Sequence, residues 1–166
     1  FRILEPKKEM EGWGTPVFLA WTTTPWTLPS NTALCVGPKY DYVAVRSYNP
    51  YTSEKITAVV AEPLLYSIFN KKAEELKLDD YKAGDKLIPF EVVGRWKGTE
   101  LEGMRYEQLL PWVKPVEADE KGNWTVAEDK AFRVILGDYV TVEDGTGIVH
   151  IAPTFGADDA FVARQA

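Results

Sequence analysis

The sequence predicts one domain of mixed α/β class that is rich in β-strands, with a β-barrel-like arrangement and two or three peripheral helices. First, the chain has 166 residues, of which 45% are hydrophobic and 27% are charged, and these values are ordinary for a single folded core. Second, seven short runs rich in β-branched and aromatic residues alternate with turn signals. Third, only two stretches have the apolar spacing or the capping residue of a helix.

The predicted strands are short and occur along the whole chain. They are Val17–Trp21, Tyr42–Arg46, Ile56–Val60, Phe90–Val93, Phe132–Leu136, Tyr139–Val142 and Ile148–Ile151. The stretch Lys114–Lys130 is the most loop-like part of the sequence, with a turn expected at Gly122-Asn123. Six or seven strands with so few helices are typical of a β-rich, barrel-like domain.

Two helices are predicted between and after these strands. Pro63 suits the first turn of the earlier helix, and apolar residues within 64–76 recur on one face. The later helix is expected to begin at Asp158 or Asp159, because an aspartate side chain accepts hydrogen bonds from the free N–H groups at a helix start. Both helices are expected at the periphery of the strands.

Composition excludes several classes of protein. The single cysteine, Cys35, has no internal disulfide partner, and the single histidine, His150, lies far from it in sequence, so we expect no metal site. No apolar run approaches the roughly 20 residues that cross a bilayer, and no signal peptide is evident, so we expect a cytoplasmic protein with no membrane partner. The net charge of −6 argues against a domain that holds nucleic acid by itself.

The segment Trp21–Asn31 (WTTTPWTLPSN) is the most unusual part of the sequence. Thr22 and Thr23 extend a predicted strand, and Pro25 favours an extended conformation for the residue before it. Because side chains alternate along extended backbone, Thr22 and Thr24 are expected to face one side. Threonine holds its hydroxyl in place at low entropic cost, which suits the wall of a small polar site. Strand propensity alone explains the same residues, and local physics favours this structural alternative.

The segment Gly145–Asp159 (GTGIVHIAPTFGADD) is the second candidate for a functional site. If Ile148–Ile151 is a strand, His150 points to the opposite face from its two neighbours. The following loop places Asp158 and Asp159 at a helix start, where an ionised carboxylate is stabilised and can receive an ammonium group. A hydrogen-bonded strand histidine and a capping aspartate are the structural alternative, which local physics again favours.

Together these two segments, in this order, strongly resemble the editing domain that is inserted into the catalytic core of isoleucyl-tRNA synthetases, which are class I aminoacyl-tRNA synthetases. A third block, Lys97–Glu107 (KGTELEGMRYE), is similar to the Gly-x-x-Leu-x-Gly-x-x-Tyr signature of the same insert. The resemblance extends from Phe18 to Phe161. The valyl and leucyl inserts usually have Thr-Thr-Arg-Pro where this chain has Thr-Thr-Thr-Pro, so the isoleucyl insert is the better match.

The resemblance implies a role for each matching residue. The implied catalytic residues are Thr22, Thr23, Thr24, His150 and Asp159, and the implied substrate-binding residues are Thr22, Thr27, Asn31 and Asp159. Asp159 matches the residue that binds the α-ammonium group of the aminoacyl ester, which leaves Asp158 as the helix cap. His150 matches the position that limits side-chain size and so excludes isoleucine.

The resemblance also implies the reaction, the ligands and the domain organisation. Residues 1–166 would form a single editing domain of a larger synthetase, since the chain lacks an initiator methionine and stops within a helix-like run. The domain would hydrolyse Val-tRNA(Ile) after transfer, without a cofactor of its own, while ATP and Mg²⁺ belong to the parent catalytic core. Its partners would be the 3′ end of mischarged tRNA(Ile), valine and valyl-adenylate analogues, and the rest of the synthetase. A valyl- or leucyl-type insert and a non-catalytic β-barrel RNA-binding module are the alternatives.

Overall fold

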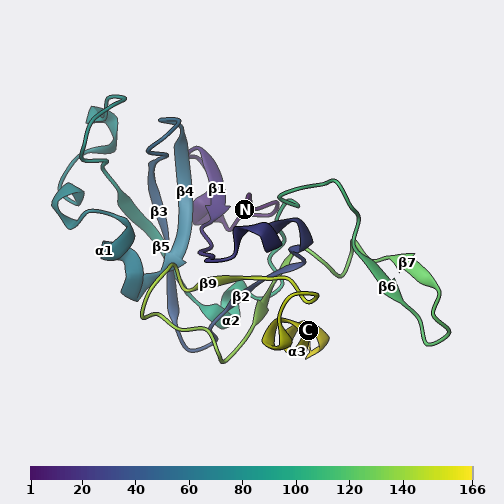
Figure 1. The fold of residues 1–166 in the computed structure, drawn as a ribbon. Helices are drawn as coiled ribbons and strands as arrows, with labels where there is room; N and C mark the ends of the chain where they lie inside the picture. Colours follow the sequence, from purple (N-terminus) through teal and green to yellow (C-terminus); the bar gives the residue numbers. More distant parts are fainter. Residues whose placement is uncertain (166) are drawn as a thin grey trace.

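A four-stranded sheet in the order β1-β4-β3-β5 forms one layer of the molecule (Figure 1). Strands β3 (Asp41–Tyr48) and β4 (Lys55–Ala61) pair antiparallel, and β5 (Glu91–Lys97) pairs antiparallel with the other edge of β3. Strand β1 (Thr15–Phe18) pairs parallel with β4. The structure, a computed structural model, describes residues 1–165, apart from the side chain of Asp158.

A three-stranded sheet in the order β8-β2-β9 forms the next layer. Its central strand, β2 (Ala33–Val36), is buried at every residue. Strand β8 (Arg133–Leu136) pairs parallel with β2, and β9 (Ile148–Ile151) pairs antiparallel with it. The alternation of side chains along β9 directs Ile148 to one hydrophobic cluster and Ile151 to another, on the opposite face of this sheet.

The main core lies between the two sheets. The first sheet contributes Phe18, Tyr42 and Val59 to it, and the second contributes Leu34 and Ile148. Alternation along the strands supplies the outer faces as well, because neighbouring residues on β3 and β2 point to the other side. These outer faces carry two smaller clusters, one under residues 62–90 and one under helix α3 (Ala157–Gln165). The layers are therefore, in order, residues 62–90 with their short helical turns, the four-stranded sheet, the three-stranded sheet and helix α3.

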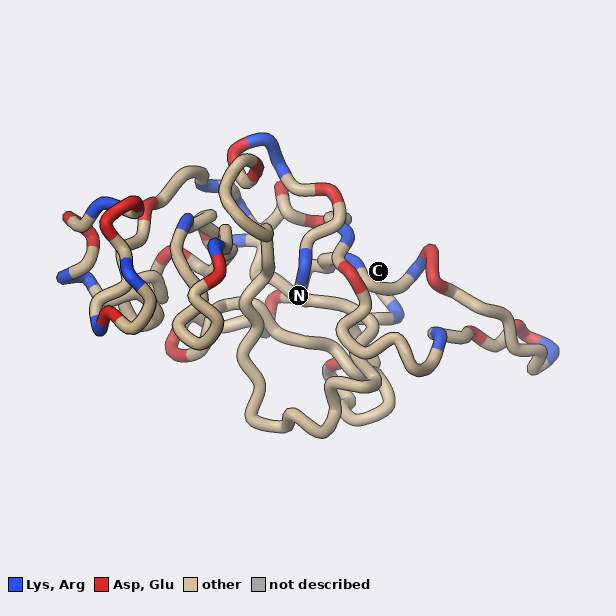
Figure 2. The backbone as a smooth tube through the Cα atoms, turned by 90° about the horizontal axis from the view of Figure 1, so that it is seen from above, with Lys and Arg blue, Asp and Glu red and all other residues tan. Residues whose placement is uncertain are grey.

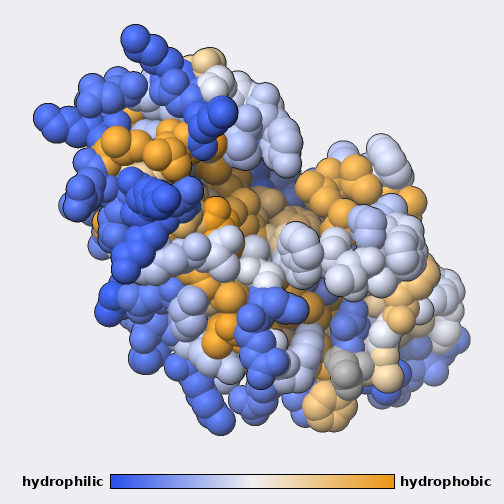
Figure 3. Space-filling view, turned by 60° about the vertical axis from the view of Figure 1, so that its left-hand side comes forward, coloured by the Kyte–Doolittle hydropathy of each residue, from blue (hydrophilic) through white to orange (hydrophobic). Residues whose placement is uncertain are grey.

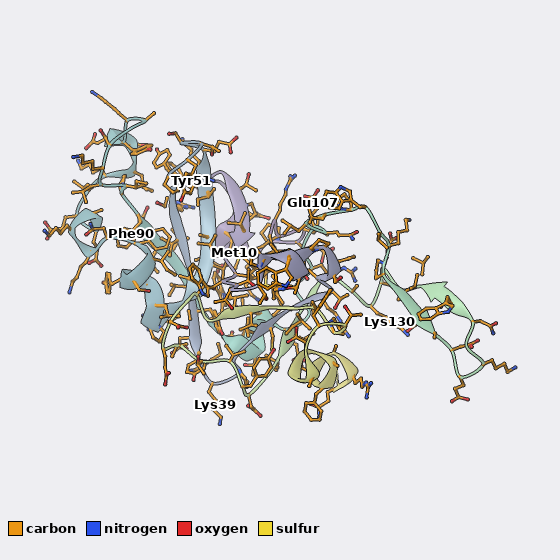
Figure 4. The ribbon with its side chains drawn as sticks, in the orientation of Figure 1. Met10, Lys39, Tyr51, Phe90, Glu107 and Lys130 are labelled. Atoms are coloured by element: carbon orange, nitrogen blue, oxygen red, sulfur yellow. The ribbon has the colours of Figure 1, made fainter. Side chains whose placement is uncertain are left out.

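The remaining elements are short turns of helix and one hairpin. The helical turns are η1 (Lys8–Met10), η2 (Pro25–Ser30), η3 (Glu62–Leu64), α1 (Leu65–Ile68), η4 (Lys71–Ala73), η5 (Leu78–Asp80) and α2 (Gly98–Leu101). Met10 of η1 is fully buried and points into the molecule (Figure 4). Strands β6 (Val116–Ala118) and β7 (Trp124–Val126) form a hairpin that projects away from the layers (Figure 1).

The β-rich mixed class is confirmed, but the sheets stay open within residues 1–165 and do not close into a barrel. The predicted helix after Pro63 is wrong beyond its first turns, because Phe69 is extended (φ −106°, ψ 132°). The Asn70 side chain then accepts a hydrogen bond from the backbone N–H of Lys72 at 3.0 Å and starts a separate turn. Helix α3 begins at Ala157, one or two residues before the predicted start.

One predicted strand is absent, a second is displaced along the chain, and three strands, β2, β6 and β7, were missed. Residues 139–142 form a turn instead of a strand, since the N–H of Val140 bonds back to the carbonyl of Gly137. The strand predicted at Val17–Trp21 lies earlier, at Thr15–Phe18. Strand β2 was missed because a strand buried on both faces lacks the alternation of polar and apolar residues. No helix within the described residues is long and apolar enough to cross a membrane.

The predicted turn at Gly122-Asn123 is confirmed, although the stretch around it is a hairpin and not only a loop. Gly122 has φ +80°, a conformation that favours glycine, and its N–H bonds to the carbonyl of Asp119 at 2.9 Å. The Asp119 carboxylate also accepts the N–H groups of Lys121 and Asn123. Lys130, at the base of the hairpin, contacts Glu117 at 2.7 Å (Figure 4).

Candidate active site

The threonine segment and strand β9 meet at one cavity of about 420 Å³. Trp21 forms an isolated parallel β-bridge with Val149, which places the residues after it beside β9. The cavity is lined by Trp21, Thr22, Thr23, Thr24, Trp26, Thr27, Val149, His150, Phe155, Gly156 and Asp159. The structure thus brings together six of the seven site residues predicted from sequence.

The threonine segment is a tight turn that leads into a 3₁₀ helix, rather than the end of a strand. Pro25 is the first residue of η2, where its missing N–H is no disadvantage. The N–H of Thr24 bonds to Thr22 Oγ1 at 3.0 Å, and the two hydroxyl oxygens lie 3.4 Å apart. The prediction that these two hydroxyls share one side is therefore confirmed, although the cause is the turn and not strand alternation.

His150 is buried, with 6% of its surface exposed, and both of its ring nitrogens have polar neighbours. Nε2 lies 2.7 Å from Thr27 Oγ1, whose own hydrogen is donated to the carbonyl of Thr24 at 2.8 Å. Thr27 must then accept from Nε2–H. On the other side of the ring, Nδ1 lies 3.2 Å from Asn31 Nδ2, which carries only hydrogens and so must be the donor. These partners assign a neutral imidazole that is protonated on Nε2.

The surroundings favour the same neutral state. Burial lowers the pKa of His150, while the nearby Asp159 carboxylate opposes that shift. A neutral ring with its Nδ1 lone pair and its Nε2 proton both engaged has no free lone pair for accepting a proton from water. The geometry therefore makes His150 a fixed wall of the cavity and argues against a general base at this position.

Among the residues whose side chains the structure describes, Asp159 is the one formally charged residue in the cavity wall. It lies in the first turn of α3, and its Oδ2 accepts the N–H of Ala152 at 2.9 Å, which ties the helix start to the end of β9. Gly156 makes room for this contact, since a Cβ there would lie 3.2 Å from Cγ of Asp159. The site thus combines threonine hydroxyls, a neutral imidazole and one carboxylate.

Asn31 is the predicted site residue that the structure places elsewhere. It is buried behind His150 and lines a different cavity, beside Pro29 and Ser30. Its amide bonds to the Ala33 carbonyl and to His150, so the structure places Asn31 against His150 and outside the lining of this cavity, and its contact with substrate stays a prediction. The predicted role of Asp158 as helix cap concerns a side chain outside the described part of the structure.

Sequence reasoning missed three aromatic residues of the cavity wall, Trp21, Trp26 and Phe155, and one residue behind the wall. Trp26 and Phe155 line the cavity with 70% and 60% of their surface exposed. Trp26 belongs to the threonine segment that the sequence singles out, and its place in that segment was the available signal for it. Tyr106 is buried behind the cavity and donates its hydroxyl hydrogen to Asn31 Oδ1 at 2.5 Å.

A larger cavity, of about 590 Å³, lies beside Trp13 and Phe90. Its wall contains charged and apolar residues but no serine, threonine or histidine. The smaller cavity at the threonine segment is the better candidate, because it alone of the two combines hydroxyls, an imidazole and a carboxylate. Among the described residues, no group of three or more His, Cys, Asp and Glu side chains is arranged to hold a metal ion.

Comparison with known proteins identifies relatives over the whole chain. No family model matches it. The chain is 71% identical over 166 residues to isoleucine–tRNA ligase of Bacteroides thetaiotaomicron, covering all of this chain and 14% of that protein. It is 57% identical to isoleucine–tRNA ligase of Porphyromonas gingivalis, covering 99% of this chain and 14% of that protein. The chain therefore spans about one seventh of the length of these relatives.

Solved structures share its fold at low sequence identity. The editing domain of the P. falciparum cytosolic leucyl-tRNA synthetase has a TM-score of 0.61 and 16% identity, covering 89% of this chain and 44% of that chain. GlLeuRS-CP1 has a TM-score of 0.59 and 18% identity, covering 92% of this chain and 44% of that chain. The chain therefore belongs to the isoleucine–tRNA ligase family, as a segment that has the fold of the CP1 editing domains.

Proposed function

We propose that this segment hydrolyses the ester of Val-tRNA(Ile) and so removes valine that the parent ligase has attached in error. One observation carries the proposal: hydroxyls, one carboxylate and a buried imidazole surround a cavity of about 420 Å³. The physical need is general, because one methylene changes binding by only ~1–3 kcal/mol, a limit for which isoleucine–tRNA ligase is itself the standard illustration. A second site that accepts only the smaller side chain supplies the missing discrimination.

Six residues of the cavity have a task in this reaction. Asp159 receives the α-ammonium group of the aminoacyl ester through charge-assisted hydrogen bonds. The hydroxyls of the four threonines orient the ester and the attacking water; they are Thr22, Thr23, Thr24 and Thr27. His150 limits the space for the side chain, so the longer isoleucine does not fit with its ammonium group on Asp159.

The hydrolysis needs no covalent intermediate on the protein. The water oxygen bonds to the ester carbonyl carbon, and the bond from that carbon to the ribose oxygen breaks. One proton of the water passes to the ribose oxygen, which leaves as a hydroxyl, and valine is released as the free amino acid. Because His150 has no free lone pair, we assign the proton transfer to the neighbouring ribose hydroxyl of the substrate.

The wider setting is part of the same proposal. The 3′ end of tRNA(Ile) and the rest of the ligase are the partners, and valine or valyl-adenylate analogues are ligands of the cavity. The domain works without a metal or cofactor, whereas ATP and Mg²⁺ serve the parent catalytic core. We place the protein in the cytoplasm.

Single-turnover deacylation of Val-, Ile- and Thr-charged tRNA, by this chain and by the full ligase, tests the proposal. We expect cleavage of the valyl ester and sparing of the isoleucyl ester. Asp159→Asn should slow valyl cleavage by about 10- to 100-fold, as expected for the loss of hydrogen bonds to a charged group. Asp129→Asn removes an exposed carboxylate that does not line the cavity and should leave the rate unchanged.

The same assay separates the alternatives. Preferential cleavage of the threonyl ester would assign the chain to valyl-type editing. Binding of charged tRNA without cleavage of any ester would assign a non-catalytic module. Full activity of Asp159→Asn would remove the carboxylate from the mechanism.

A further inference from the structure

Tyr106 is a buried residue that the proposed reaction does not use. Only 1% of its surface is exposed, and its ring packs edge-on against Phe1 and Phe132, with centroids 5.2 and 6.1 Å away. It lies outside the cavity wall. Its hydroxyl nevertheless reaches Asn31 Oδ1 at 2.5 Å, and burial raises the pKa of the phenol, so it remains a hydrogen-bond donor.

The Asn31 side chain connects Tyr106 to His150, because the same amide bonds to both. Its Nδ2 donates one hydrogen to the Ala33 carbonyl at 2.9 Å and the other to His150 Nδ1 at 3.2 Å. The Oδ1 atom therefore faces Tyr106, and the whole amide is used. If the amide turned over, its oxygen would face the Ala33 carbonyl, and two acceptors would meet in a buried site.

The contact between Asn31 and His150 is the longest in this series, so it is the one that a loosened amide would lose first. Without a donor at Nδ1, only the contact with Thr27 would keep the proton on Nε2. A proton on Nδ1 would in turn leave Nε2 as an acceptor facing Thr27, whose hydrogen is already donated to Thr24. The orientation and the tautomer of His150 thus depend on Thr27 and on the amide of Asn31 together.

We propose that Tyr106 is a positioning residue for His150: acting through Asn31, it holds the ring neutral, protonated on Nε2 and fixed against Thr27. The effect of this positioning on substrate discrimination rests on the proposed editing function. The effect on the tautomer of His150 does not rest on it, because the tautomer is a property of the free protein.

His150 is the single histidine of the chain, so ¹⁵N labelling of histidine reports on this ring alone. The two ring nitrogens of the wild type should have widely separated ¹⁵N shifts, as one protonated and one unprotonated nitrogen require. Tyr106→Phe keeps the packed ring and removes the hydroxyl, and it should bring the two shifts closer together by mixing the tautomers. Unchanged shifts in Tyr106→Phe would overturn the proposal.

Tyr42→Phe is the matched control. Tyr42 is fully buried, and its hydroxyl bonds to Gly37 and Gly147, neither of which contacts the His150 ring. This variant should lower the melting temperature while leaving the ¹⁵N shifts of His150 as they are in the wild type. Equal movement of the shifts in both variants would show a general loosening of the core and would contradict a specific role for Tyr106.

Asn31→Asp keeps the test decisive if Tyr106→Phe does not fold. The substitution replaces the donor at Nδ1 by an acceptor of the same shape, so it should move the proton to Nδ1 and raise the pKa of His150. Wild-type shifts and titration in Asn31→Asp would overturn the series of contacts.

Deacylation provides the functional arm. In Tyr106→Phe the preference for the valyl over the isoleucyl ester should fall about fivefold, the ratio that corresponds to one neutral hydrogen bond. If the tautomer shifts as expected but the wild type cleaves no ester, the editing function fails and the positioning of His150 stands. If the wild type edits and the tautomer does not move, the positioning fails and the editing function stands.

Discussion

His150 and Asp159 reach one cavity from different elements, β9 and α3, and they are held in different ways. The histidine has a polar neighbour at each ring nitrogen, which fixes its position and its proton. The carboxylate accepts one backbone N–H and is the one formal charge that the described side chains bring to the cavity wall. A fixed neutral group suits steric selection, and a lone charge suits the binding of an ammonium group.

The neutral state of His150 predicts how stability depends on pH. Burial lowers its pKa below the usual value, so between these two values the unfolded chain binds a proton that the folded chain does not. The free energy of unfolding should therefore fall as pH decreases from 7 towards 5, with a slope of at most about 1.4 kcal/mol per pH unit from this group. Urea denaturation at several pH values measures the slope.

His150→Gln is the control for this prediction, because it removes the only histidine. The difference in unfolding free energy between wild type and variant should shrink towards low pH, because protonation of His150 then stabilises the unfolded wild-type chain. A difference that stays constant from pH 7 to 5 would mean that His150 has the same pKa in both states.

Single-residue properties were predictable where they depend on nearby sequence. The shared side of the Thr22 and Thr24 hydroxyls is an example, since both residues belong to one short turn. The position of Asn31 was not, because it depends on Tyr106, a residue 75 positions away in the chain. No local pattern in the sequence specifies such a contact.

Strand β2 shows that local sequence patterns can also fail to reveal a whole element. Its four residues are buried on both faces, between the main core and the cluster under α3, so no alternation marks it in the sequence. Strand β9 was predicted with its observed bounds, because β-branched residues flank His150 and turn residues precede them. The helix after Pro63 was overestimated, since apolar spacing does not show where Asn70 interrupts it.

The burial of β2 predicts the reactivity of its cysteine. Cys35 is fully buried, and burial raises the pKa of its thiol to about 11. A disulfide reagent at pH 8 should therefore label the folded chain at least ~100-fold more slowly than the chain in 8 M urea, because the thiolate is scarce and inaccessible. Rapid labelling of one thiol in the folded chain would contradict the placement of β2.

Because the hairpin projects from the sheets, we expect substitutions in it to change the stability of the chain little. Trp124 of β7 has 70% of its surface exposed, and all the strand residues of the hairpin are exposed. Trp124→Ala should therefore change the free energy of unfolding by no more than about 0.5 kcal/mol. Phe18→Ala, at a fully buried position of β1, is the comparison and should cost about 3–5 kcal/mol. Equal costs in chemical denaturation would show that the hairpin packs against the rest of the chain.

Charge is mixed over the molecule as a whole. Figure 2 shows blue and red segments interspersed along the backbone on the left and on the right of the view, and the formal net charge is −6. Apolar side chains gather in a hollow of the face in Figure 3, while hydrophilic side chains surround it. Such a surface gives little electrostatic attraction for a phosphate backbone.

This surface predicts weak binding of tRNA by the chain alone. At about 0.15 M salt, fluorescence anisotropy with labelled tRNA(Ile) should detect no binding at micromolar concentrations of the chain, because few phosphates are neutralised. The whole isoleucine–tRNA ligase of Bacteroides thetaiotaomicron, of which this chain matches 14%, is the comparison protein. Submicromolar affinity of the chain with a steep dependence on salt would contradict the expectation.

The central claim is that one cavity accepts the valyl ester and that His150 excludes the isoleucyl ester. The most direct measurement is the ratio of single-turnover deacylation rates for Val-tRNA(Ile) and Ile-tRNA(Ile), in the wild type and in a folded His150→Ala variant. We predict that the variant cleaves the isoleucyl ester at least ~10-fold faster than the wild type does, because one methylene in a pocket changes discrimination by about that factor or more. A folded variant that keeps the wild-type ratio would contradict the claim.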